Sequence, residues 1–260
     1  MFESTIADGV LQLSRPECRW LSTGWDGGTS VGGAAYNVTV PEGWDRTDVG
    51  SYVTERLDRA GFDEEGPALL TGVEMRHARG ACLGPVVAYA TVGLSNPAVL
   101  PIDPIGTGST SNIDRRPDRT TTQPHDRNDP GTVNLIVGTT RRLPESARAN
   151  LLSVVAEAKA ATLLAVAGVP GTTTDAIVVA DDPNGETATF TGSATAVGDA
   201  ARACVREAVR SSVQSRYADR EIPGSVEAAD YGTVTDRCAE VFRPWSTGVL
   251  FDDDTGNDIR

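Results

Sequence analysis

The sequence predicts an α+β fold in which a mixed, largely antiparallel sheet and packed helices form a single-domain sandwich. Strand-like segments come in runs along the chain, and two of them flank a turn signal typical of an antiparallel hairpin. Three longer segments have the period of helices with one apolar face. A chain of 260 residues, 39% of them apolar, can bury a sizeable core as one domain.

The strands and helices follow from these periods in order along the chain. Strands are expected at residues 32–40, 67–75, 85–94 and 132–140. A further pair, 175–180 and 186–192, flanks Asn184-Gly185, which favours a two-stranded hairpin. Helices are expected at about 48–60, from Pro144 to about Ala167, and at about 196–216.

The chain is expected to form one domain over residues 1–250. Residues 101–131 are rich in proline, glycine, threonine and aspartate and contain few apolar residues, so we expect a flexible insertion there. Residues 251–260 form an acidic tail.

The charge balance excludes some partners. The chain has 36 Asp and Glu against 23 Lys and Arg, a net charge of −13, which is typical of a protein kept soluble in concentrated salt. Such a chain does not favour a nucleic-acid partner. No run approaches about 18 apolar residues and the amino terminus does not resemble a signal peptide, so we expect a cytoplasmic protein without a membrane span.

The cysteines and histidines do not indicate a metal site. Cys18, Cys82, Cys204 and Cys238 are widely spaced, and no Cys/His cluster is present, so free structural thiols are the expected state. No dedicated metal is expected.

Lys159 is the single lysine among the 23 Lys and Arg. On a helical wheel, Glu157 and Lys159 lie roughly 160° apart, on opposite shoulders of the apolar stripe, so they cannot pair with each other. One interpretation of Lys159 is a solvated side chain lying along apolar surface. The other is a site that needs a compact ammonium, for which arginine is no substitute. The stripe itself is predicted to contain Ala147, Leu151, Val154, Val155, Ala158, Ala161 and Ala165.

Six blocks occur in the order and approximate spacing of one enzyme family: "TGVEM", "ATVGLSNP", "GTVNLIV", "AEAKAATL", "GTTTDAIVVA" and "TGSATAVG". In these blocks the chain resembles the adenosylcobinamide amidohydrolase family of archaeal corrinoid salvage, and "WLSTGWDGG" with "AAYNVTV" is similar to the family's amino-terminal part. The resemblance implies that water cleaves the amide joining aminopropanol to the corrin ring, which gives adenosylcobyric acid and 1-amino-2-propanol. The adenosylated corrinoid is then the substrate, and no cofactor is implied.

The resemblance also places the family's Glu-Ala-Lys motif on Glu157 and Lys159. Two positions depart from the family pattern. Thr173 stands where the family tends to have glycine, and it must avoid a positive φ or accept strain. Ala156 stands where the family often has threonine, which weakens the case for a hydroxyl nucleophile there.

Amide hydrolysis needs a base, stabilisation of the oxyanion and a proton for the leaving amine. Asp175, which begins an apolar strand after a Gly-Thr turn, is the first candidate for the base, and a turn-capping aspartate is the equal alternative. Glu157 is the candidate second carboxylate, and Lys159 is the candidate cation for the oxyanion or leaving group. Ordinary structural charge pairs would explain both residues equally well.

A corrin ring is fringed with amides, so neutral donors and acceptors suit it better than charges. Each candidate taken alone also fits a turn or a cap. The candidate substrate-binding residues are Asn37, Thr71, Ser95, Asn96, Asn134 and Thr174.

Two alternatives remain open from the sequence. A chain that kept the fold but lost the chemistry would be a non-catalytic corrinoid-binding or carrier protein. The arginine row Arg202, Arg206 and Arg210 is expected to be a solvated face that pairs with carboxylates, in preference to a phosphate-binding row, and that face could equally serve a homo-oligomer contact.

Overall fold

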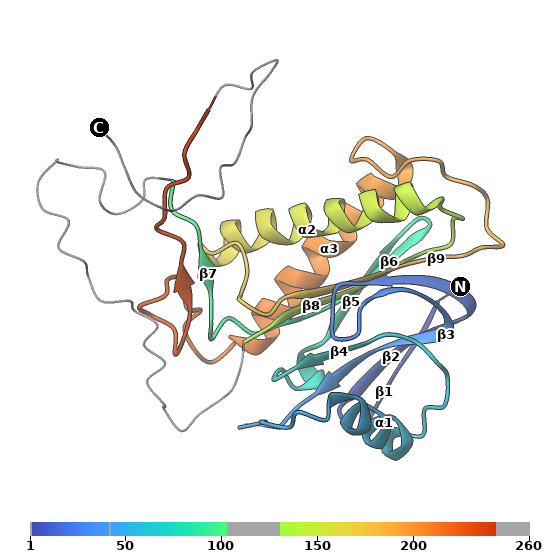
Figure 1. The fold of residues 1–260 in the computed structure, drawn as a ribbon, viewed down its shortest axis with the longest axis horizontal. Coiled ribbons are helices and arrows are strands. Elements are labelled where there is room, and N and C mark those ends of the chain that lie inside the picture. The colour runs from blue at the N-terminus through green and yellow to red at the C-terminus, as the bar shows by residue number, and fades with distance from the viewer. Residues whose placement is uncertain (1, 42, 103–130, 243–260) are drawn as a thin grey trace, which may run out of the picture.

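The computed structural model describes residues 2–41, 43–102 and 131–242 (Figure 1). Most of the predicted insertion at 101–131 and the whole acidic tail at 251–260 lie outside these residues, so the domain boundaries stay a prediction. In chain order the elements are β1 (Glu3–Ala7), β2 (Val10–Ser22), β3 (Gly28–Thr39), α1 (Val49–Ala60), β4 (Ala68–Thr71), the 3₁₀ turn η1 (Met75–His77), β5 (Arg79–Leu83), β6 (Val86–Val92), β7 (Ala98–Val99), β8 (Val133–Thr139), α2 (Glu145–Ala167), β9 (Ala176–Asp181), α3 (Ala196–Arg216) and β10 (Thr233–Val234).

One large sheet organises the described chain. Its strands run in the order β4-β3-β2-β9-β8-β6-β5, and β1 lies beside the first half of β2. The pairs β3–β4 and β8–β9 are parallel, and the other pairs are antiparallel. The predicted mixed, largely antiparallel sheet is therefore confirmed.

The sheet curls so strongly that its two halves face each other. Asn37 on β3 donates a hydrogen bond through Nδ2 to Thr91 Oγ1 on β6 at 2.8 Å. Asn134 on β8 donates through Nδ2 to Asn37 Oδ1 at 2.9 Å, although β2 and β9 lie between β3 and β8 in the sheet. The enclosed inner face holds an apolar cluster around Trp20, Leu69, Ile136 and Val178.

The helices cover the outer face of this curled sheet. α2 and α3 pack with β6, β8 and β9 in the largest apolar cluster, which includes Leu135, Leu151 and Val205. α1 packs on β2, β3 and β4 in a separate cluster around Tyr36 and Tyr52. Figure 1 shows α1 below the sheet and α2 and α3 above it, as expected for helices on the outside of two facing halves.

The three predicted helices are confirmed, but the apolar stripe of α2 is only partly as predicted. Ala161 and Ala165 are exposed, whereas Thr162, Leu163 and Ala167 are buried. After Ala158 the buried row steps by four, to Thr162, where the prediction steps by three, to Ala161, so the buried face shifts about the helix axis.

The predicted hairpin at 175–192 is wrong in its second arm. Both edges of β9 are occupied, by β2 on one side and β8 on the other, so no edge is left for residues 186–192. The strand-like pairing of that segment in the described chain is limited to an isolated bridge from Thr187 to Arg142. The turn itself is present, since Gly185 N donates to Asp182 O at 3.1 Å.

Two further differences concern strands. The segment predicted as one strand at 67–75 is divided into β4 and η1. The β1–β2 hairpin was not predicted, although its Asp8-Gly9 turn, with φ of 44° and 72°, has the sequence and conformation of a two-residue hairpin turn.

α2 is long and apolar enough, with a mean hydropathy of 1.5, to cross a membrane by length and composition alone. The core helix of a folded domain passes the same test. Here Leu151, Val155 and Leu163 lie in the core between the sheet and α3.

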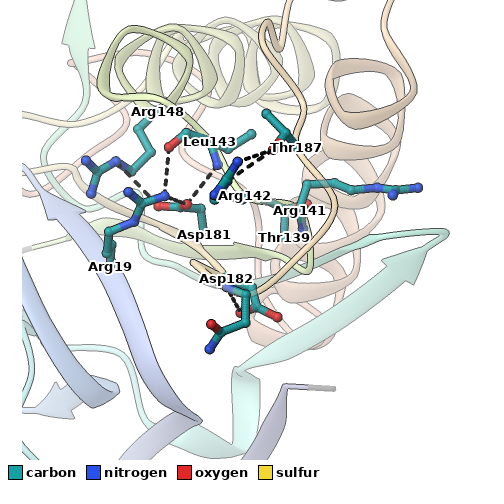
Figure 2. A network of polar contacts seen from close by, with 10 residues as sticks. Arg19, Thr139, Arg141, Arg142, Leu143, Arg148, Asp181, Asp182 and Thr187 are labelled. Atoms are coloured by element: carbon teal, nitrogen blue, oxygen red, sulfur yellow. Dashed lines mark hydrogen bonds and ion pairs between the residues drawn. The ribbon is translucent and has the colours of Figure 1, made fainter.

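A buried charge network lies at the far end of β9 from Asp175. Figure 2 shows Asp181 beside Arg19 and Arg148, with a dashed contact from its carboxylate to each of them. Asp181 is fully buried, and Arg148 is 6% exposed. Leu143 N also donates to Asp181 Oδ2 at 2.8 Å, so the network ties β2, β9 and the start of α2 together.

Candidate active site

Lys159 and Asp175, sixteen residues apart, form an ion pair where α2 passes the start of β9. The Asp175 carboxylate also accepts hydrogen bonds from Thr172 N at 3.1 Å and Val133 N at 3.0 Å, and from the Thr172 hydroxyl. The side chains are 13% and 10% exposed, respectively. The structure therefore brings together two of the three predicted catalytic residues.

The space around the ion pair explains why this position holds a lysine. A Cβ added at Gly171 would lie 2.9 Å from Lys159 Nζ and 2.3 Å from Asp175 Oδ2. The Gly171 backbone thus closes the pair on one side, and a planar guanidinium, which is wider than an ammonium, does not fit without moving that loop. Lys159 is accordingly a partly buried, paired lysine and not a solvated one.

The loop before β9 is fixed by hydroxyl contacts. Thr174 Oγ1 lies 2.8 Å from Thr132 Oγ1 and donates to Gly131 O at 3.1 Å. Thr173, which stands where the family tends to have glycine, is not among the described residues with positive φ, so it avoids the strained conformation. Its backbone N donates to Asn96 O at 3.2 Å.

A cleft of about 320 Å³ opens beside this loop, at the mouth of the inner face of the sheet. Its wall is mainly apolar, with Trp25, Trp44 and Leu69 among its residues, and Asp175 is the one ionisable side chain among the described residues that line it. The full lining is Thr23, Gly24, Trp25, Val40, Trp44, Leu69, Leu70, Thr71, Gly72, Thr132, Thr174, Asp175 and Ala176.

Of the predicted substrate-binding residues, Thr71 and Thr174 line the cleft. Asn37 and Asn134 lie behind it, buried and bonded to each other, and Asn134 Nδ2 also donates to Leu70 O at 2.9 Å. Asn134 Oδ1 is buried and has no hydrogen-bond partner among the described residues. The two asparagines form a polar layer beneath the cleft.

Ser95 and Asn96 lie in the loop after β6, next to the loop that carries Asp175. Asn96 Nδ2 donates to Thr173 Oγ1 at 2.6 Å, and Ser95 O accepts from Tyr231 N at 2.9 Å. A Cβ at Gly131 would lie 2.4 Å from Ser95 N, so this glycine permits the segment before β8 to pack closely on the loop that carries Ser95. In the described chain these residues support the loops, and neither lines the cleft.

Glu157 lies apart from the other two predicted catalytic residues. Its side chain is 65% exposed and forms a long ion pair with Arg202 on α3, at 3.8 Å. It does not line the cleft. This geometry agrees with the wheel, which places Glu157 and Lys159 on opposite shoulders of α2, and it gives no support to Glu157 as the second carboxylate.

Sequence reasoning did not select Trp25, Trp44 or Thr132, all of which line the cleft. A signal was available for Trp25, because a tryptophan in a glycine-rich turn, "TGWDGG", cannot be a core residue of a strand. Trp44 Nε1 is buried and has no hydrogen-bond partner among the described residues.

Segments far apart in sequence converge on this one cleft. "WLSTGWDGG", "AAYNVTV", "TGVEM", "GTVNLIV" and "GTTTDAIVVA" each contribute at least one lining residue. "AEAKAATL" contributes Lys159, which pairs with Asp175 from behind. "TGSATAVG" instead starts α3, where the Thr195 hydroxyl caps the helix by accepting from Gly198 N at 3.0 Å.

Other candidates from the sequence have ordinary roles. Arg202, Arg206 and Arg210 pair with Glu157 and Glu207, which confirms a solvated, charge-paired face. The four cysteines are free, and Cys18 and Cys204 are buried. Across the described ranges, no group of three or more His, Cys, Asp or Glu could hold a metal ion.

Comparison with known proteins identifies the family of this chain. A family model described as "Adenosylcobinamide amidohydrolase" matches residues 2–221. A curated protein of that name from Halobacterium salinarum is 56% identical over 246 residues, which cover 94% of this chain and 100% of the relative. The chain belongs to the adenosylcobinamide amidohydrolase family.

Proposed function

We infer that this protein hydrolyses adenosylcobinamide at the amide that links aminopropanol to the corrin ring. The products are adenosylcobyric acid, which can re-enter cobalamin synthesis, and 1-amino-2-propanol. The observation that carries the assignment to this cleft is the convergence of five family-like segments on it, together with one ionisable side chain in its wall.

Asp175 is the base in this proposal. Water must be activated next to the scissile amide, and Asp175 is the carboxylate that the described cleft offers. Both carboxylate oxygens of Asp175 already accept hydrogen bonds. The carboxylate can therefore take a proton from water only after one of its present donors has moved away and the water has taken that donor's place. The Thr172 hydroxyl can rotate away, whereas the backbone N–H donors of Thr172 and Val133 are fixed.

Lys159 supports this role from behind the carboxylate. Through the ion pair, its ammonium holds the Asp175 carboxylate in place while a proton is taken up and passed to the leaving amine. The geometry favours this supporting role over direct contact with the substrate, since Lys159 is not a lining residue.

The rest of the cleft suits a corrinoid arm. The hydroxyls of Thr71, Thr132 and Thr174 can bond to amide groups, and the apolar surface of Trp44 can contact the ring edge. A cleft of about 320 Å³ holds the amide arm and the edge of the ring and leaves the rest of the macrocycle outside.

We also propose that the protein works in the cytoplasm without a bound cofactor, because its substrate is a soluble metabolite and α2 is accounted for as a core helix. Nucleic acid is not a partner in this proposal, since the net charge is −13. A homo-oligomer remains a proposal that sedimentation in concentrated potassium chloride would test.

The decisive experiment incubates the purified protein with adenosylcobinamide in concentrated potassium chloride and follows both products by mass spectrometry. We expect Asp175→Asn to abolish turnover while corrinoid binding is retained. Glu207→Gln, an exposed carboxylate on α3, serves as the matched control and should keep full activity. Binding without product in the unaltered protein would instead mean a corrinoid carrier.

Glu157→Gln decides the remaining catalytic candidate. The sequence motif alone predicts a large loss of turnover in this variant. The exposed position of Glu157 and its contact with Arg202 predict activity close to that of the unaltered protein.

A further inference from the structure

A second cavity lies on the other side of Trp25 from the active-site cleft. It has a volume of about 240 Å³ and shares Trp25 with the cleft. At β4 the two hollows lie on opposite faces of the strand, because Ala68 lines one and its neighbour Leu69 lines the other, so Trp25 is the lining residue that joins them. A ligand larger than the cleft can therefore reach both hollows across Trp25.

Trp25 is held in place and still accessible. It lies in the turn between β2 and β3, which is anchored to β9 because Thr23 N donates to Ile177 O and Ile177 N donates to Thr23 Oγ1, both at 2.9 Å. A Cβ at Gly50, in the first turn of α1, would lie 3.2 Å from the indole Cη2. The side chain thus fits between a fixed turn and a helix, yet Trp25 remains 47% exposed.

The polar groups of the second cavity are acceptors and hydroxyls. Asp26 and Glu65 provide carboxylates, and neither forms an ion pair with another described residue. Ser22, Thr29 and Ser30 provide hydroxyls, and the described lining contains no lysine, arginine or histidine. Such a cavity repels phosphates and suits an uncharged ligand that carries O–H and N–H donors.

A nucleoside has these properties. Its sugar hydroxyls and exocyclic amine donate hydrogen bonds that carboxylates accept, and its purine is a flat ring that stacks on an indole. In adenosylcobinamide such a group is bonded to the cobalt on one side of the corrin plane, and the scissile amide belongs to a side chain at the edge of the ring. A ring whose amide arm enters the cleft can extend its nucleoside over Trp25.

We propose that this second cavity is the binding site for the adenosyl group of the substrate, with Trp25 stacking on the adenine and Glu65 and Asp26 accepting hydrogen bonds from the ribose and the amine. The proposal rests on the proposed function for the identity of the whole substrate. It makes Trp25 the residue that distinguishes adenosylated corrinoids from those with a small axial ligand.

The test compares two substrates on five proteins. Adenosylcobinamide and cobinamide with cyanide as its axial ligand are hydrolysed by the unaltered protein and by the variants Trp25→Ala, Trp25→Phe and Glu65→Gln. Phe190→Ala serves as the control, because Phe190 is an exposed aromatic residue, 58% accessible, that lines neither hollow.

We expect Trp25→Ala to raise KM for adenosylcobinamide by about tenfold or more, as loss of base stacking does elsewhere. KM for the cyanide form should change less than about twofold, and Trp25→Phe should restore most of the preference. Equal losses for both substrates would mean that Trp25 holds the corrin ring itself, and no loss for either would mean that the adenosyl group lies elsewhere. Both results overturn the proposal.

A second measurement separates this proposal from the proposed function. 5′-Deoxyadenosine alone is titrated by calorimetry into the unaltered protein, Trp25→Ala and Glu65→Gln. Binding that is lost in the variants supports the cavity even if hydrolysis of adenosylcobinamide is never observed. Hydrolysis that proceeds normally while the nucleoside does not bind and the cyanide form reacts equally well overturns the cavity and leaves the hydrolase assignment intact.

Discussion

Replacing Asp175 with asparagine tests the central contact of the site most directly. The carboxylate accepts from four donors: Val133 N, Thr172 N, the Thr172 hydroxyl and Lys159. An asparagine has one carbonyl oxygen, so its amide group must face either Thr172 N–H with Lys159 or Val133 N–H with a hydroxyl that can rotate. At least one buried donor loses its acceptor in either orientation, and Lys159 loses its counter-ion.

The magnitude follows from these losses. An unsatisfied buried donor costs about 1–3 kcal/mol, and breaking a buried ion pair costs about 3–5 kcal/mol. Because the two side chains keep 10–13% exposure, we expect Asp175→Asn to lower the free energy of unfolding by about 3 kcal/mol. Lys159→Met leaves three of the four hydrogen bonds in place and should cost about 2 kcal/mol.

The assay is a double-mutant cycle of urea unfolding curves at one fixed, high potassium chloride concentration. The double variant should be destabilised by at least about 1 kcal/mol less than the sum of the single variants, because Lys159→Met removes the cation that Asp175→Asn leaves unpaired. The exposed pair of Glu157 and Arg202 is the control cycle and should show little coupling.

Additive single effects, or an Asp175→Asn protein as stable as the unaltered one, would refute the reasoning that this carboxylate is held by a buried pair. Loss of turnover together with unchanged stability would mean that Asp175 is catalytic without being structural. Loss of stability with turnover retained in the folded fraction would mean that Asp175 is structural without being catalytic.

Four other outcomes follow from the structure. Gly171→Ala should lower stability by about 1–3 kcal/mol in the same urea assay, because its Cβ would enter the ion pair. Asp181→Asn should cost about 3–5 kcal/mol by leaving two arginines without their carboxylate. Burial and the neighbouring Arg76 lower the pKa of His77 from its usual 6.5. The contribution of neutral His77 to stability is therefore complete above pH 6.5 and is lost as the pH falls toward the pKa of the folded protein. His77→Gln should flatten this part of the stability profile. Burial raises the pKa of the Cys18 thiol to about 12 and that of Cys204 to about 11, so a maleimide should modify these two thiols only after unfolding.

Each of these outcomes can fail on its own. A Gly171→Ala protein of full stability would show that the loop yields without cost. Asp181→Asn without effect would mean that water replaces the lost acceptor, and a pH profile unchanged by His77→Gln would assign the acid loss to carboxylates. Rapid labelling of all four thiols in the folded protein would contradict the burial of two of them.

The sequence by itself determined the parts of the fold that depend on local pattern. α1, α2 and α3 have apolar periods and boundary residues that any helix of that composition would show, and β3, β6 and β8 are apolar runs bounded by turn residues. The wheel alone also separated Glu157 from Lys159, because helix geometry fixes their angle whatever the surroundings. Asp175 could be selected because a carboxylate at the start of a buried strand is conspicuous.

Only the tertiary structure decided what these residues meet. Residues 186–192 have strand-like composition, but β9 has no free edge, and pairing depends on neighbours that are distant in sequence. The curl of the sheet brings Asn37 to Asn134 and places Trp25 over the cleft, and no local pattern encodes that closure. Lys159 meets Asp175 only because α2 crosses the start of β9, where the bare backbone of Gly171 leaves room for an ammonium and not for a guanidinium.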